Sequence, residues 1–203
     1  MLEKTRFTEM LIAENGLDRG GFDHWVFCPG MRFNSPKKWW GDHGRRAYPH
    51  EGVDFCLYRD RAGQVCRLDE NTRLPAMHDG TVKAVFTDYL GRALIIEHES
   101  PLVAGGRFLS IYAHTRPAAG MRVGAVVRKG DVIAAIAGTA GSKSGIIPHL
   151  HFSLGIPAPS FSYAPFTWDT IQTPEMITLR DPFQIMDRPG RVLDAGDICC
   201  REL

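Results

Sequence analysis

The sequence has almost no net charge and no long apolar run. Its 203 residues include 24 Lys and Arg against 23 Asp and Glu, a formal net charge of +1, so a nucleic-acid-binding surface is not indicated. No stretch approaches the ~20 consecutive apolar residues of a transmembrane helix. Charges also interrupt residues 1–19, where a signal peptide needs an apolar core. The protein is therefore cytosolic, or lacks a leader that has been removed, or is exported by a route that the sequence does not show.

Cysteine is scarce, and its odd count of five leaves at least one thiol unpaired unless chains cross-link. The count therefore does not settle the redox compartment. A hairpin of residues 54–58 and 64–68 around a turn at 59–63 would place Cys56 opposite Cys66. Directly opposed side chains lie near disulfide range. Both a disulfide and two buried thiols fit this pattern.

Helical periodicity is also rare, and only residues 8–15 show a weak helical pattern. The 21 glycines and 13 prolines punctuate the chain at roughly the eight-to-twelve-residue spacing of short strands. Runs typical of β-strands lie at residues 80–86, 93–98, 107–114, 124–129, 131–137 and 150–154. We therefore predict a mainly β protein with little helix.

Two short stretches carry most of the chemical information. They are HEGVD, from His50 to Asp54, and HLH, from His149 to His151. In a strand, His149 and His151 point to one face, and His50 and Asp54 also share a face because four residues are two strand periods. Two imidazoles and a carboxylate are the ligands of a catalytic zinc site, and zinc would offset the cost of burying such polar groups.

His114 ends a predicted strand and would complete a hydrolytic centre. Each histidine alone is more simply a structural or surface residue. The prediction depends on the co-occurrence, in chain order, of both short patterns and a strand-end histidine within one β-rich region. His98 also ends a predicted strand, and we expect it to support the site or to be structural. His24, His43 and His78 lie in loop-like sequence and carry no further indication of a site.

The order of motifs closely resembles that of the lysostaphin/LytM-type zinc metalloendopeptidases. The match covers about residues 46–155 and consists of HEGVD (50–54), LPAMHDGTV (74–82), YAH (112–114), VGAVVRKGDVI (123–133) and HLHF (149–152). Two departures border the expected groove: a long connection between Asp54 and Leu74, and the extra residues 146–148. They bear on substrate specificity more than on metal binding.

The resemblance implies an antiparallel, sandwich-like β-sheet metallopeptidase domain with a long central groove. It implies one Zn²⁺ per chain, held by His50, Asp54 and His151. It also implies hydrolysis of peptide links in peptidoglycan, or of another small peptide, and a periplasmic or extracellular location in the bacterial envelope. The domain would span residues 45–155, between an N-terminal arm at 1–44 that packs on it and a C-terminal extension at 156–203.

Proton transfer falls to His114 and His149, the two histidines that the resemblance leaves as non-ligands, because the sequence lacks the glutamate of an H-E-x-x-H motif. Imidazole, with an unperturbed pKa near 6.5, suits this task. We expect a zinc-activated water assisted by both histidines. Spacing does not say which of them is the general base.

Two other classes of function remain open. Some relatives of such enzymes are non-catalytic or latent modules that regulate cell-wall hydrolases, but all five site positions are present here. Residues 124–138 also resemble a biotinyl or lipoyl carrier hairpin, yet Lys129 precedes Gly130 and lacks the flanking methionines of a carrier lysine. We therefore favour a metalloendopeptidase, and make no prediction of oligomeric state.

Overall fold

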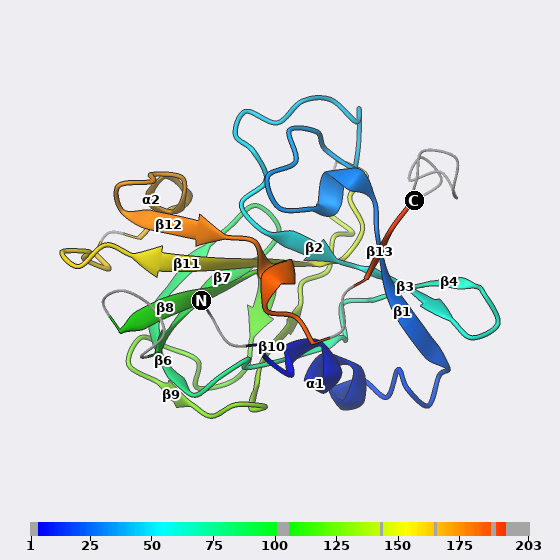
Figure 1. The fold of residues 1–203 in the computed structure, drawn as a ribbon, viewed down its shortest axis with the longest axis horizontal. Coiled ribbons are helices and arrows are strands. Elements are labelled where there is room, and N and C mark those ends of the chain that lie inside the picture. Colours follow the sequence, from blue (N-terminus) through cyan, green and yellow to red (C-terminus); the bar gives the residue numbers. More distant parts are fainter. Residues whose placement is uncertain (1–3, 101–105, 143, 165, 188–189, 194–203) are drawn as a thin grey trace.

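Strands dominate the computed structural model, which describes residues 4–100, 106–142, 144–164, 166–187 and 190–193. The mainly β fold predicted from the sequence is confirmed (Figure 1). The helical elements are α1 (Phe7–Glu14), η1 (Pro29–Met31), α2 (Trp168–Ile171) and η2 (Pro182–Gln184). The strands are β1 (Phe22–Phe27), β2 (Val53–Phe55), β3 (Leu57–Asp60), β4 (Val65–Arg67), β5 (Arg73–Pro75), β6 (Gly80–Thr87), β7 (Arg92–Glu99), β8 (Arg107–Pro117), β9 (Val126–Val127), β10 (Val132–Ile136), β11 (Leu150–Pro157), β12 (Ile177–Arg180) and β13 (Arg191–Val192). No helix within the described ranges is long and apolar enough to cross a membrane.

The larger of two sheets has nine strands, and every pairing within it is antiparallel. Its main path runs β12-β11-β8-β7-β6-β9. Strand β2 pairs with the first half of β11, and β12 pairs with the second half. β2 and β12 therefore follow one another along the same edge of β11.

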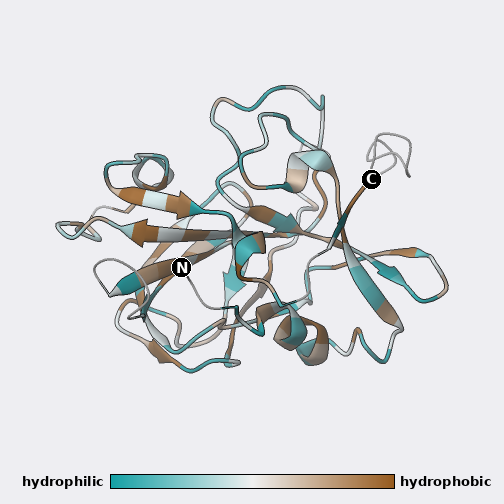
Figure 2. Ribbon diagram, viewed as in Figure 1, coloured by the Kyte–Doolittle hydropathy of each residue, from teal (hydrophilic) through white to brown (hydrophobic). Residues whose placement is uncertain are grey.

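The period-two alternation of the strands gives this sheet two different faces. Leu94, Tyr112 and Phe152 point into the main hydrophobic core. On the other face, His151 of β11 is paired with Asp54 of β2 on one side and with Ala113 of β8 on the other. β11 is mostly hydrophobic, whereas the loop between η1 and β2 is mostly hydrophilic (Figure 2).

The first 44 residues contribute large side chains to the main core. Phe7 of α1 stacks on Phe152 with ring centroids 4.6 Å apart, and Trp25 of β1 is fully buried. β1 pairs with β3 in the smaller sheet, whose order is β13-β1-β3-β4. The carboxylate of Asp187 accepts hydrogen bonds from the first turn of α1, which ties this helix to the C-terminal part of the chain.

The register expected for the cysteine hairpin is wrong. Cys66 lies opposite Tyr58 rather than opposite Cys56. The loop is shorter than expected, because Asp60 and Gln64 already pair across it, and Gly63 adopts the left-handed conformation with φ 84°. Cys56 is buried, Cys66 is half-buried, and both are free thiols. Burial raises the pKa of the Cys56 thiol well above its usual value.

Candidate metal centre

Three donor atoms from two neighbouring strands and the loop before them converge at one point. His50 Nε2 lies 3.0 Å from Asp54 Oδ1 and 3.0 Å from His151 Nδ1, and the latter two atoms are 2.9 Å apart. The pairing of Asp54 with His151 across β2 and β11 brings their side chains together. All three side chains are buried, so the sequence pattern has become a compact cluster.

The other ring nitrogen of His50 determines what its Nε2 can do. His50 Nδ1 lies 3.0 Å from the backbone carbonyl oxygen of Arg32. A carbonyl only accepts, so Nδ1 donates, and the neutral ring then has a lone pair on Nε2. That lone pair faces the Asp54 carboxylate, a contact that is satisfied only when a proton or a metal cation lies between the two atoms. Two imidazole nitrogens and one carboxylate oxygen are a donor set that fits zinc.

Asp54 is ionised despite its complete burial. Burial opposes the charge, but His50, His151 and His149 outweigh it and hold the pKa of the Asp54 carboxyl well below its usual value. Its second oxygen, Oδ2, accepts a hydrogen bond of 2.6 Å from the indole Nε1 of Trp39. The Arg46 guanidinium lies 3.7 Å from the same oxygen. No sequence pattern predicts this role for Trp39, which lies outside the motifs in the N-terminal arm.

His149 lies at the rim of the cluster as a neutral base. Its Nδ1 donates to the Ile147 carbonyl over 2.9 Å, so its Nε2 carries the lone pair. That Nε2 is 4.0 Å from Asp54 Oδ1. Burial lowers the pKa of His149 to about 3; the charge of Asp54 opposes this shift and His114 adds to it. His149 is therefore unprotonated near neutral pH.

His114 occupies a distorted position at a bulge in β8. Its φ is 60°, a conformation that non-glycine residues rarely adopt, and the pairing between β7 and β8 shifts register nearby. Its ring centroid lies 4.8 Å from that of His149 and 5.8 Å from that of His151. The five residues predicted from the sequence thus lie together in space.

Asp88 holds this bulge in place. Its Oδ2 accepts the backbone N–H of His114 at 2.6 Å, and its Oδ1 lies 3.3 Å from His114 Nδ1. The same Oδ1 accepts the backbone N–H groups of Leu90 and Gly91. Burial opposes the negative charge, but these bonds outweigh it and lower the pKa of Asp88 to about 2. In the sequence, Asp88 reads only as a turn residue, so its position beside His114 was missed.

Residues from the C-terminal extension wall the cluster. The Trp168 ring of α2 meets the His151 ring edge-to-face at 5.4 Å and the Phe86 ring at 6.2 Å. Gln172, just after α2, donates a hydrogen bond of 2.5 Å to Glu51. The extension therefore lies against the face of the sheet that carries His151, and it forms part of the surroundings of the candidate site.

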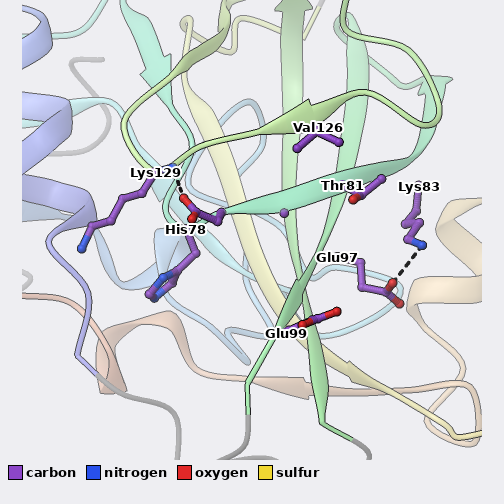
Figure 3. A pocket seen from close by; sticks show the side chains of 9 residues that line it. His78, Thr81, Lys83, Glu97, Glu99, Val126 and Lys129 are labelled. Carbon is purple, nitrogen blue, oxygen red and sulfur yellow. Dashed lines mark hydrogen bonds and ion pairs between the residues drawn. The ribbon is translucent and has the colours of Figure 1, made fainter.

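A second polar region lies where β6 begins and β7 ends. It is a pocket of about 510 Å³ whose lining includes His78, Asp79, Lys83, Glu97 and Lys129 (Figure 3). Lys83 pairs with Glu97 at 2.9 Å, and Asp79 Oδ1 accepts the backbone N–H of Lys129 at 2.7 Å. None of the five predicted site residues lines this pocket. Over the described part of the chain, only His50, Asp54 and His151 form a group able to hold a metal ion.

The model of Peptidase family M23 matches residues 49–158, more than half of the chain. The chain belongs to peptidase family M23. The resemblance to lysostaphin/LytM-type enzymes is thereby confirmed. The match includes all five predicted site residues, although membership of the M23 family does not by itself assign a role to any of them.

Several solved structures are similar to this chain at low sequence identity. Csd3 of Helicobacter pylori is 21% identical, with 86% of this chain and 37% of that chain covered and a TM-score of 0.44. Lysostaphin is 19% identical over 80% of this chain and 56% of that chain, with a TM-score of 0.45. The catalytic domain of the prophage-encoded M23 protein EnpA from Enterococcus faecalis is 20% identical over 60% of this chain and 79% of that chain, with a TM-score of 0.38. A comparison with curated proteins finds no match.

Proposed function

We propose that the protein is a zinc-dependent endopeptidase that hydrolyses peptide bonds in peptidoglycan cross-links or bridges. The observation that carries the proposal is the cluster of His50 Nε2, Asp54 Oδ1 and His151 Nδ1, in which a lone pair of His50 faces a carboxylate. Membership of peptidase family M23 supports the reaction class. The proposal includes one zinc ion per chain, a peptide substrate and a location in the bacterial cell envelope.

Bound zinc would supply an acidified water as nucleophile and polarise the scissile carbonyl. We assign proton transfer to His114, because Asp88, 3.3 Å from its Nδ1, stabilises the ring once it is protonated. The Nδ1 of neutral His149 is bound to the Ile147 carbonyl, so its Nε2 is free to accept a hydrogen bond from the attacking water. His114 would then return the proton to the departing amine.

The proposal can be tested on the purified full chain by metal analysis combined with digestion of purified peptidoglycan. New amino termini identified by mass spectrometry, and absent when a chelator is added, are the expected result. They would also identify the bond. A chain that binds zinc stoichiometrically but releases no new termini from peptidoglycan or from stem-peptide fragments would contradict the endopeptidase proposal.

One observation favours the latent or regulatory alternative. His50, Asp54, His149 and His151 are all at most 5% exposed, and Trp39 and Trp168 pack against rings of this group. A substrate would need more access than this. The alternative predicts zinc binding without hydrolysis by the full chain, and hydrolysis that appears only after the surrounding residues are displaced, for example with Trp168→Ala.

A further inference from the structure

The two oxygens of the Asp54 carboxylate have different partners. Oδ1 faces His50 and His151, whereas Oδ2 accepts the indole N–H of Trp39 at 2.6 Å. Trp39 is 3% exposed, so no solvent competes for this hydrogen bond. The Arg46 guanidinium also lies 3.7 Å from Oδ2, beyond hydrogen-bond distance, so the Trp39 hydrogen bond is the direct contact that leaves Oδ1 for the two histidines.

The loop at residues 36–46 holds Trp39 in this position. Lys38 N donates to the Gly44 carbonyl at 2.9 Å, and Arg46 N donates to the Pro36 carbonyl at 2.9 Å, so the loop folds back on itself. The backbone of Trp39 also passes close to Gly30, where an added Cβ would lie 2.8 Å from Trp39 N. The loop lies beside β2, at the top of Figure 1. The loop's own backbone bonds therefore fix the position from which the Trp39 side chain extends towards Asp54.

The same indole ring also contacts the candidate catalytic machinery. Its centroid lies 5.2 Å from that of His149, with the planes at 87°, an edge-to-face contact. Trp39 therefore contacts a ligand carboxylate with its N–H and a proposed catalytic histidine with its ring.

We propose that Trp39 is a positioning residue of the metal centre. It holds Asp54 with Oδ2 engaged, so that Oδ1 alone is offered to a bound metal. The inference rests on the proposed zinc site and extends it to the N-terminal segment, which lies outside residues 49–158 matched by the family. Partners of this kind, which orient a ligand without touching the metal, typically change metal affinity about 10–100-fold when they are removed.

The direct test is the zinc dissociation constant of Trp39→Phe, measured by competition with a chromophoric chelator. Phenylalanine keeps an aromatic ring against His149 and removes only the N–H donor. Trp40→Phe is the matched control, because Trp40 packs on Trp39 at 5.6 Å and under Arg46 but contacts no ligand. Zinc affinity should fall about 10–100-fold in Trp39→Phe and change less than about twofold in Trp40→Phe.

A second variant guards against a folding defect. Site-specific replacement of Trp39 by 3-benzothienylalanine preserves the bicyclic ring and exchanges the N–H for sulfur, so its zinc affinity should fall like that of Trp39→Phe. Cobalt(II) substituted into either protein should absorb less in the visible than in the parent protein, because a freed Oδ2 can also coordinate and raise the coordination number.

Unchanged zinc affinity in both Trp39 variants would overturn the inference. An equal loss in Trp40→Phe would also overturn it, because the effect would then come from general packing of the loop. These binding measurements need no turnover. Tight zinc binding by the parent protein without peptide hydrolysis would contradict the proposed endopeptidase and leave the role of Trp39 to be decided by the affinities.

Discussion

The histidines of the metal centre and the buried His98 of β7 differ in the partners of their ring nitrogens. Near the C-terminal end of β7, His98 Nδ1 lies 2.8 Å from the Asp79 carbonyl oxygen, and its Nε2 lies 2.7 Å from the Ser110 hydroxyl. Neutral His98 donates to the carbonyl and accepts from the hydroxyl, so it is satisfied by the protein alone.

The metal centre lacks this balance. His50 donates to a carbonyl as His98 does, but its other nitrogen faces the Asp54 carboxylate and a second imidazole. Hydrogen bonds among neutral groups do not satisfy that contact. The comparison shows that burial of a histidine is no indication of metal binding. The indication is a ring nitrogen whose neighbour is another acceptor.

The largest effect should come from removing a ligand. We expect His50→Ala, Asp54→Ala and His151→Ala each to lose stoichiometric zinc, with zinc affinity reduced more than about 100-fold and no detectable turnover. Inductively coupled plasma mass spectrometry after dialysis measures the zinc content. His98→Gln is the matched control and should keep one zinc per chain. Full zinc occupancy in all three ligand variants would mean that the cluster is not the metal site.

The next effect separates turnover from zinc binding. His114→Ala and His149→Ala should keep one zinc per chain and lose about 10²–10⁴-fold in kcat, the usual contribution of general acid–base catalysis. Zinc analysis and hydrolysis of a fluorogenic stem peptide, carried out on the same preparations, measure both quantities. If either variant lost zinc along with activity, that histidine would belong with the ligands.

A smaller effect should follow from changing the residue behind His114. Asp88→Asn keeps an oxygen that can accept the backbone N–H of His114 but removes the charge 3.3 Å from His114 Nδ1. We expect kcat to fall about tenfold with KM and zinc content unchanged, less than after loss of the histidine itself. Asp131→Asn is the control, because Asp131 also accepts a backbone N–H in a turn and lies away from the centre. Equal losses in both variants would indicate a stability effect.

The regular part of the fold could be predicted from the sequence. Alternating apolar residues in β8 and β11 place one set of side chains in the core, and the same alternation places His151 and Asp54 together on the other face. The five candidate site residues were therefore accessible through periodicity and motif order. The cysteine register was not, because it depends on whether Gln64 pairs with Tyr58, as expected, or with Asp60, as observed.

The partners that support the site could not be predicted. Trp39 reaches Asp54 from an irregular loop, and Asp88 reaches His114 across a bulge in β8. Neither contact follows from a repeat of two or of 3.6 residues, because loops and bulges are fixed by tertiary packing. Sequence periodicity thus located the groups that would touch a metal or a substrate, and the three-dimensional structure was needed for those that orient them.

The smallest effect concerns the pH dependence of stability that is caused by His98, whose ring nitrogens both have hydrogen-bond partners in the protein. Burial is the main cause that lowers the pKa of His98 from 6.5 to about 4. Below pH 6.5 His98 becomes protonated in the unfolded chain but stays neutral in the folded protein. The contribution of His98 to the free energy of unfolding is therefore fully present above pH 6.5 and is lost as the pH falls towards 4. The loss amounts to about 3 kcal/mol.

Urea unfolding of metal-free protein at pH 7 and at pH 4 should therefore show a smaller acid loss for His98→Gln than for the parent chain. Glutamine can still donate to the Asp79 carbonyl but does not titrate. The histidines of the metal centre are common to both proteins, so the difference between the two pH dependences belongs to His98. Identical pH dependences would contradict the view that His98 is held neutral by burial, and would remove the contrast between His98 and the histidines of the metal centre.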